Sequence, residues 1–134
     1  MTVRKLSKLY YLKKLIERDQ TKLKEIELRL EPGGMNMTGM PHGPTSKNMI
    51  EELMPVMIEM QEKIKEEWRE YIAEKKIIED YISTVDDYHV RYILLARFVD
   101  LMKWPEIAQK LGGNNTEDSV KKMCYRFLEN SEKK

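Results

Sequence analysis

The chain has 134 residues, of which 35% are charged and 8% aromatic, and its formal net charge at pH 7 is +1. This length allows one domain, or a small domain with an extension, and argues against a large enzyme cleft. The composition is typical of a helical protein without strands. The longest uninterrupted apolar run, Ile93 to Ala96, is too short to span a membrane, and the amino terminus lacks the apolar core of a signal peptide. We therefore expect a cytoplasmic protein.

A seven-residue repeat runs through residues 4–31, where Leu9, Ile16, Leu23 and Leu30 recur at this interval. This period is typical of a helix that packs along one stripe, as in a coiled coil. At about 1.5 Å per residue the helix would be roughly 40 Å long, and a one-sided stripe of that length is not stable alone in water. The segment therefore needs a helical partner.

Residues 32–45 contain four glycines, three prolines and no charged residue, which predicts a flexible loop. A second long helix is expected from residue 46 to residue 82. Pro55 lies inside it and should either bend it or divide a short leading helix from the main one. The seven-residue period returns in this helix at Ile50, Met57, Ile64, Tyr71 and Ile78.

The two predicted helices carry opposite charge. Residues 1–31 contain nine Lys or Arg and five Asp or Glu, a balance of +4, whereas residues 46–82 contain six and ten, a balance of −4. Because the loop lets the chain reverse, the prediction for residues 1–82 is a long antiparallel helical hairpin of coiled-coil type. Apolar surface left uncovered by the hairpin favours a homodimer. Alternatively, the basic first helix contacts nucleic acid through Arg4, Lys5 and Lys8.

Three short helices are predicted for residues 84–130, after a hinge at 83–87 unless the long helix runs on unbroken. The first ends near Asp100. The second begins at Trp104, with proline in its first turn, and ends at a Gly-Gly-Asn-Asn segment, where Asn115 or Thr116 can cap the third. The expected core residues of the last two helices are Trp104, Ile107, Ala108, Leu111, Val120, Met123, Cys124 and Phe127.

Ala108, followed four residues later by Gly112, lets two helices cross closely around a sharp turn, as in a helix-turn-helix. The segment W-P-E-I-A-Q-K-L-G, followed by S-V-K-K-M-C-Y-R-F-L, resembles region 4 of bacterial sigma factors. With the coiled segment ahead of it, the chain is similar to the ArpU/RinA-type transcription regulators encoded by phages. The spacing from Gly112 to Val120 is longer than in the usual pattern, so the connection should exceed a minimal turn.

This resemblance implies a phage or prophage regulator. Its carboxy-terminal module, residues 84–130, would contact double-stranded promoter DNA, and its hairpin would dimerise or contact RNA polymerase. Residues 84–134 have nine Lys or Arg against eight Asp or Glu, so a monomer should bind DNA weakly. On a helical wheel the outward face of the third helix carries side chains that donate to phosphates and base edges: Ser119, Lys121, Lys122, Tyr125 and Arg126.

Two other functions stay open. Near-neutral charge favours a protein-interaction adaptor, whose hairpin recruits a partner and whose end module is a plain bundle. A terminase small subunit-like DNA-packaging protein is a weaker alternative, because its usual domain order is the reverse of this one. An enzyme is not expected, since no set of nucleophile, base and orienting group can be assembled. The single cysteine, Cys124, should be a buried apolar residue, and with His42 and His89 it forms no metal-ligand pattern, so neither a metal nor a cofactor is predicted.

Overall fold

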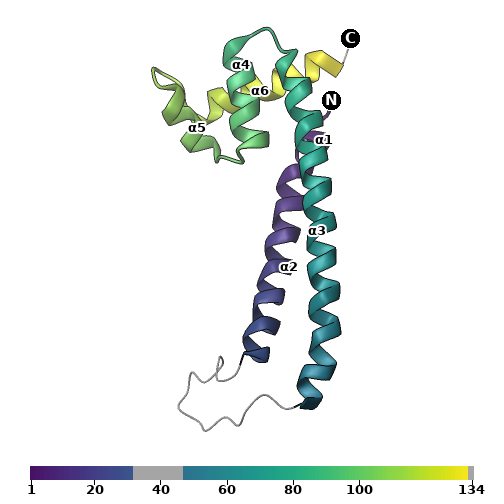
Figure 1. Ribbon diagram of the computed structural model, residues 1–134. Coiled ribbons are helices and arrows are strands. Elements are labelled where there is room, and N and C mark those ends of the chain that lie inside the picture. Colours follow the sequence, from purple (N-terminus) through teal and green to yellow (C-terminus); the bar gives the residue numbers. More distant parts are fainter. Residues whose placement is uncertain (32–46, 133–134) are drawn as a thin grey trace. The chain divides into compact units, whose positions relative to one another are not determined.

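The computed structural model describes residues 1–31 and 47–132. Within these ranges every regular element is a helix, which confirms the predicted all-α class (Figure 1). The loop predicted at 32–45 lies outside the described residues. In chain order the elements are α1 (Val3–Leu6), α2 (Lys8–Leu30), α3 (Lys47–Ser83), α4 (Tyr88–Leu94), the π-helical turn η1 (Leu95–Val99), α5 (Trp104–Leu111) and α6 (Glu117–Glu132).

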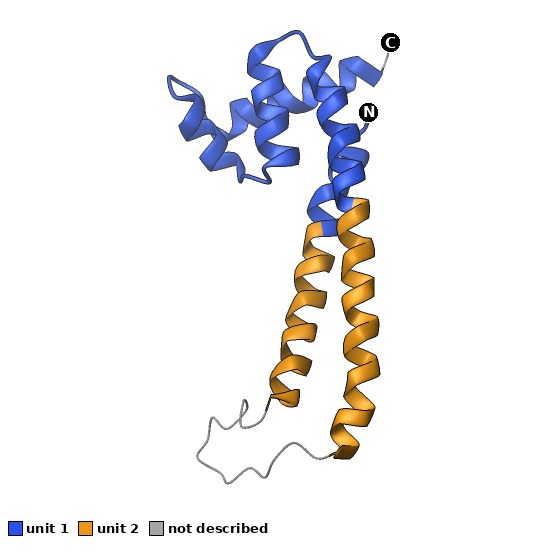
Figure 2. Ribbon diagram, viewed as in Figure 1, with its two compact units in different colours: residues 1–12, 71–134 blue, residues 13–70 orange. Residues whose placement is uncertain are grey.

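Packing divides the chain into two compact units, coloured separately in Figure 2. Unit 1 consists of Met1–Leu12 and Tyr71–Lys134, and unit 2 is Lys13–Glu70. The division therefore crosses α2 and α3, whereas the sequence predicts a boundary between the hairpin and the carboxy-terminal module. The reason is that Leu6 and Leu9 are fully buried in the core of unit 1.

The first helical segment is not continuous over residues 4–31. It is interrupted at Ser7, which ends α1 and precedes α2. The interruption is a single residue, and Leu6 and Leu9 on either side of it lie in the same buried cluster. The start of the chain is thus held by tertiary packing.

One hydrophobic cluster forms the core of unit 1, and it joins the start of the chain to the end of α3 and to α4, η1, α5 and α6. Most of the expected core residues of the last two helices are buried in it: Trp104, Ile107, Ala108, Val120 and Cys124. Three expected core residues are not fully buried, and one residue that was not expected in the core is buried there. Leu111, Met123 and Phe127 are only half-buried at the edge of the cluster, and Leu128 is enclosed.

Helical geometry explains why Leu128 of α6 is enclosed, whereas Met123 and Phe127 are half-buried. Val120, Cys124 and Leu128 are spaced by four residues and lie along one line of the helix. Met123 and Phe127 lie one step around the helix from that line, so they sit where the contact with the core ends. The predicted stripe was therefore displaced to one side by about 50° around the helix.

The connection between α3 and α4 is fixed by hydrogen bonds. Asp87 caps α4, because its carboxylate accepts the backbone N–H of His89 at 2.9 Å. The guanidinium of Arg91 reaches back and donates to the carbonyl of Val85 at 2.6 Å and to that of Ser83 at 3.3 Å. Helix α3 ends at Ser83. In the predicted hinge that follows, the carbonyl groups of Ser83 and Val85 are held by the Arg91 side chain.

A tight reversal leads from η1 into α5. Leu101 adopts a left-handed backbone angle, φ 59°, and the N–H of Met102 returns to the carbonyl of Ala96 at 2.9 Å. Arg97 donates to the carbonyl of Met102 at 3.0 Å, and its guanidinium lies 4.7 Å from the centre of the Trp104 ring. Arg97 thus stabilises the reversal that aims α5, which begins at Trp104 with proline in its first turn as predicted.

Five residues connect α5 and α6, more than in a minimal turn, as expected. Gly112 and Gly113 both have positive φ, 70° and 62°, which favours glycine at each position. The side chain of Asn115 donates to the carbonyl of Gly112 at 2.9 Å. Thr116 and Ser119 then form a reciprocal cap, in which each hydroxyl accepts the backbone N–H of the other residue, at 3.1 and 2.8 Å.

In unit 2 the helices α2 and α3 run antiparallel, as predicted (Figure 1). Ile16 and Ile64 of the two seven-residue repeats are buried. An ion pair between Lys63 and Asp19, at 3.4 Å, joins the helices beside them. Pro55 does not divide α3, which runs through it without interruption.

Candidate nucleic-acid interface

The five predicted DNA-contact residues lie on two different flanks of α6. Successive residues turn by about 100° around an α-helix, so residues three and four apart share a flank. Ser119, Lys122 and Arg126 form one such series and line the same hollow. Lys121 and Tyr125 form the other series. The structure therefore brings together three of the five predicted residues and separates them from the other two.

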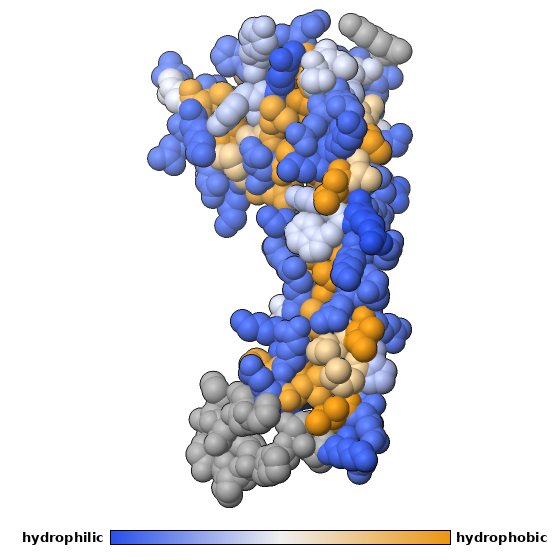
Figure 3. Space-filling model, viewed as in Figure 1, coloured by the Kyte–Doolittle hydropathy of each residue, from blue (hydrophilic) through white to orange (hydrophobic). Residues whose placement is uncertain are grey.

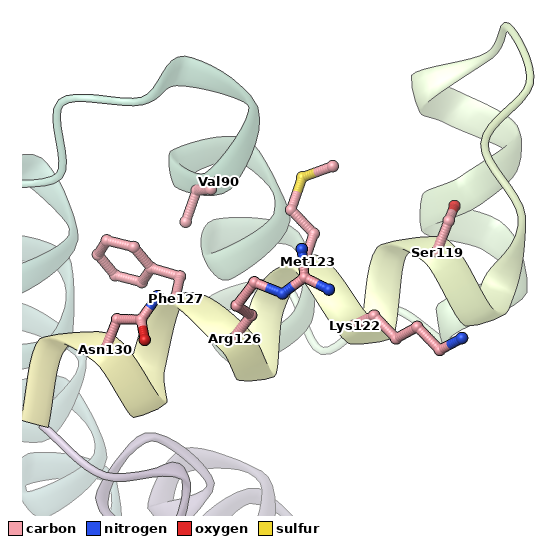
Figure 4. A pocket seen from close by; sticks show the side chains of 7 residues that line it. All are labelled: Val90, Ser119, Lys122, Met123, Arg126, Phe127 and Asn130. Carbon is pink, nitrogen blue, oxygen red and sulfur yellow. The ribbon is translucent and has the colours of Figure 1, made fainter.

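The hollow lies between α6 and the start of α4, and its volume is about 430 Å³. Figure 4 shows Met123 and Phe127 rising from α6 towards Val90 of α4. Asn130 completes the lining at the carboxy-terminal end. Val90 and Asn130 were not among the predicted site residues, because their proximity to Arg126 depends on how α4 packs across α6 and has no signature in the sequence.

Lys121 and Tyr125 are both engaged within unit 1. The ammonium group of Lys121 lies 3.1 Å from the carboxylate of Glu117, one helical turn earlier. The ring of Tyr125 packs at 5.9 Å from the ring of Trp104, although 43% of the tyrosine surface is exposed. Glu117 balances the charge of Lys121, so Lys121 is a weaker candidate for phosphate binding than its sequence neighbour Lys122.

Lys122 and Arg126 have no ion pair among the described residues, and both are exposed. They lie four residues apart, so their charges project from neighbouring turns of the same flank. The hydroxyl of Ser119 is already hydrogen-bonded to the backbone of Thr116, because it accepts the Thr116 N–H and donates to the Thr116 carbonyl at 2.9 Å. The cationic part of this flank therefore consists of Lys122 and Arg126.

The remaining arginines of the module have structural roles. Arg91 binds the carbonyl groups at the end of α3, and Arg97 holds the reversal before α5. Both guanidinium groups already donate to backbone carbonyls of unit 1. Lys122 and Arg126 are therefore stronger candidates for phosphate binding than these two arginines, and the candidate interface is on α6.

A second basic surface lies at the start of the chain, where Arg4, Lys5 and Lys8 line a hollow of about 660 Å³ together with Tyr11. Lys8 forms an ion pair with Glu74 of α3 at 3.0 Å, within unit 1. Arg4, Lys5 and Lys8 therefore lie together on the alternative nucleic-acid surface, but the charge of Lys8 is balanced by Glu74 of α3.

Unit 2 holds a pair of acids, Asp19 buried and Glu67 half-buried, that the sequence prediction did not include. Asp19 is 4% exposed, and it follows Leu12 and precedes Ile26 at intervals of seven residues, so it occupies a position of the apolar stripe. Glu67 occupies the corresponding position of α3, seven residues after Met60. The signal in the sequence was a break in the repeat at these two positions, but only the helix pairing shows that the two breaks face each other.

The two carboxyl groups titrate in opposite directions. A side-chain hydrogen bond from Glu67, assisted by Lys63, lowers the pKa of Asp19 below its ordinary value of 3.8. Burial, together with the hydrogen bond to Asp19, raises the pKa of Glu67 above 4.5. The oxygen Oε1 of Glu67 is buried without a hydrogen-bond donor among the described groups. When Glu67 is protonated, its carboxyl group can donate the hydrogen bond that Asp19 accepts as a carboxylate.

The described part of the chain indicates no reactive thiol, metal site or membrane span. The thiol of Cys124 is fully buried, as predicted, and burial raises its pKa to about 11, which keeps it in the unreactive thiol form. No group of three or more His, Cys, Asp or Glu side chains in the described ranges could hold a metal ion. None of the described helices combines the length and the apolar character of a membrane span.

Comparisons with family models, with curated proteins and with solved structures find no match for this chain.

Proposed function

We propose that this chain is a phage or prophage transcription regulator of the ArpU/RinA type, and that α5 and α6 act as a sigma region 4-like helix-turn-helix on double-stranded promoter DNA. The observation that carries the proposal is the cation pair Lys122 and Arg126 on the open flank of α6. This helix follows α5 after a short connection with two glycines in the left-handed region.

The packing of α5 against α6 supports this role. Ile107 and Ala108 of α5 and Val120 and Cys124 of α6 are buried in one cluster, which leaves the opposite side of α6 open. A recognition helix needs this arrangement, because one side must hold the helix rigidly while the other enters the major groove. Lys122 and Arg126 would contact phosphates.

Charge limits how tightly one copy binds. Glu117 and Asp118 lie in the first turn of α6, where carboxylates repel phosphate, although they can accept from the amino group of cytosine. Two free cations on α6 supply only a small electrostatic contribution per copy. A homodimer, placing two copies of α6 on one DNA site, would double the number of phosphate contacts.

The hairpin offers a surface for that dimer. Met54 and Ile58, four residues apart on α3, are 38% and 52% exposed, and Ile50, one turn before Met54 on the same flank, is exposed as well. Apolar side chains of this kind appear as orange groups open on the surface in Figure 3. We place the dimer contact here in unit 2, with RNA polymerase as a second candidate partner and the cytoplasm as the expected compartment.

A protein-interaction adaptor is the second candidate function. The near-neutral charge of residues 84–134 and the exposed apolar side chains of unit 2 favour it. In that case the hairpin recruits a protein partner, and the cations of α6 are ordinary surface groups.

Selection of genomic fragments with the purified full chain tests the proposal. The selected fragment is then titrated at two salt concentrations against Lys122→Ala, Arg126→Ala and Lys121→Ala variants. We expect the first two to weaken binding and to reduce the slope of log K against log salt by about one unit each. Lys121→Ala is the matched control, because Glu117 already balances that charge.

Three outcomes are informative. If no fragment is enriched and the Lys122→Ala, Arg126→Ala double variant still captures the same protein partners, the adaptor replaces the regulator. If DNA binds but depends on Arg4 and Lys5, the contact surface moves to the hollow beside α1. If all three lysine and arginine variants of α6 weaken binding equally, the distinction between paired and free cations is wrong.

A further inference from the structure

The hollow beside α6 has a composition that DNA binding alone does not require. Its lining includes Val90, Met123 and Phe127, and the last two are half-exposed although they lie next to the core. Phosphates need cations and hydrogen-bond donors, and they gain nothing from an apolar floor. The floor therefore points to an additional ligand with an apolar part.

The rim of the same hollow is cationic. Lys122 and Arg126 both line it, and neither has an ion pair among the described residues. Ser119 and Asn130 add polar groups at its two ends. Figure 4 shows the side chains of this rim extending from α6, which also carries Met123 and Phe127, whereas Val90 lies on α4. A guanidinium binds a carboxylate with two parallel hydrogen bonds, and the lysine adds a second positive charge.

The volume of the hollow limits the size of the ligand. About 430 Å³ lies within the range of small-molecule sites, roughly 300 to 1,000 Å³, which are mostly apolar with a few polar groups that set orientation. Met123 is unbranched and adapts its shape to an apolar guest. One or two fused aromatic rings, or a short acyl chain, fit these requirements when they carry one carboxylate.

We propose that the hollow between α4 and α6 is a binding site for a small amphipathic carboxylate, held by Arg126 and Lys122 and seated on Val90, Met123 and Phe127. This proposal rests on the proposed function in one respect. The two cations that hold the carboxylate are those assigned to DNA phosphates, so ligand and DNA compete for them and the ligand releases the protein from DNA.

Titration of the full chain with 1-naphthoate, followed by protein NMR chemical shifts and by calorimetry, tests the site without DNA. We expect saturable binding with one ligand per chain, and shift changes centred on α6 and the start of α4. The neutral analogue 1-naphthalenemethanol should bind about tenfold more weakly, because it lacks the carboxylate.

Three variants locate the site. Arg126→Gln with Lys122→Gln should weaken naphthoate binding about tenfold or more, since both charges are removed. Val90→Phe adds bulk to the α4 side of the lining and keeps both positive charges, so it should abolish binding. Lys121→Gln is the matched control on the other flank and should leave the affinity unchanged. Circular dichroism of each variant shows whether its helices are intact.

Absence of saturable binding at millimolar naphthoate overturns the proposal, and so does equal affinity for the neutral alcohol or equal binding by all variants. These outcomes do not depend on DNA, so they are distinguishable from failure of the proposed function. If naphthoate binds as expected and the selected DNA fragment also binds, added naphthoate should raise the apparent Kd for that fragment. Simultaneous binding of both at full affinity overturns the shared role of Lys122 and Arg126.

Discussion

Unit 1 and unit 2 are both built from amphipathic helices, but they enclose their apolar side chains to different extents. In unit 1 a cluster of buried residues joins segments from both ends of the chain. In unit 2 the buried apolar residues within the described ranges are Ile16 and Ile64. The repeat continues beyond them, yet Leu23, Leu53 and Met57 are only half-buried.

The difference shows that periodicity and core formation are separate properties. Two helices side by side can cover only one stripe of each other, so residues flanking the stripe stay open unless further helices pack on them. Unit 1 has those further helices, because α4, η1, α5 and α6 close over the ends of α2 and α3 that belong to it. Unit 2 does not have them in a single chain.

The largest expected effect concerns the core of unit 1. Leu128→Ala should lower the free energy of unfolding by roughly 2 to 5 kcal/mol, because Leu128 is 2% exposed and its removal leaves a cavity. Phe127→Ala, its neighbour at the edge of the cluster, should lower it by about 1 to 2 kcal/mol despite its larger side chain. Urea unfolding of the two full-length variants measures both values. A larger loss for Phe127→Ala would restore the core position that the sequence predicts for it.

A second prediction addresses the open face of unit 2. The double variant Met54→Glu, Ile58→Glu should weaken self-association about 100-fold, equivalent to ~3 kcal/mol, because it places charges in the proposed apolar contact. Ile77→Glu, an equally exposed apolar position of α3 that belongs to unit 1, is the matched control. Sedimentation velocity at micromolar concentration measures the change, and a parent protein that is monomeric there would remove the dimer from the proposal.

The smallest expected effect concerns the acid pair of unit 2. The raised pKa of Glu67 means that its contribution to stability is complete below about pH 4.5 and is lost as the pH rises through the folded-state pKa. The lowered pKa of Asp19 acts in the opposite sense, since its contribution is present above about pH 3.8 and is lost as the pH falls further. Unit 2 should therefore be less stable at pH 7 than near pH 4.5 on account of Glu67.

Glu67→Gln tests this directly. The amide donates to Asp19 at every pH, so the variant should gain about 1 kcal/mol over the parent at pH 7 and little near pH 4.5. Glu66→Gln is the matched control, because Glu66 is exposed and pairs with Arg69 on the same helix. Urea unfolding at the two pH values, followed by circular dichroism, measures the difference. The same pH dependence in both variants would contradict the hydrogen bond between Glu67 and Asp19.

Several features of this protein were determined by the sequence itself. The seven-residue periods predicted α2 and α3 and the buried positions of Ile16 and Ile64, because an apolar side chain every second turn defines one face of a helix whatever it packs against. Proline after Trp104 and two glycines at 112 and 113 predicted the ends of α5, since these residues restrict or extend the backbone angles locally.

Tertiary structure alone decided which α6 residue is enclosed and which residues of different helices lie next to each other. Whether Phe127 or Leu128 is enclosed depends on the angle at which α4 and α5 meet α6, and a helical wheel carries no information on that angle. The same packing brings Val90 beside Arg126 and sets Asp19 against Glu67. Each of these pairings joins residues on different elements, so it arises only from contacts made when the helices pack.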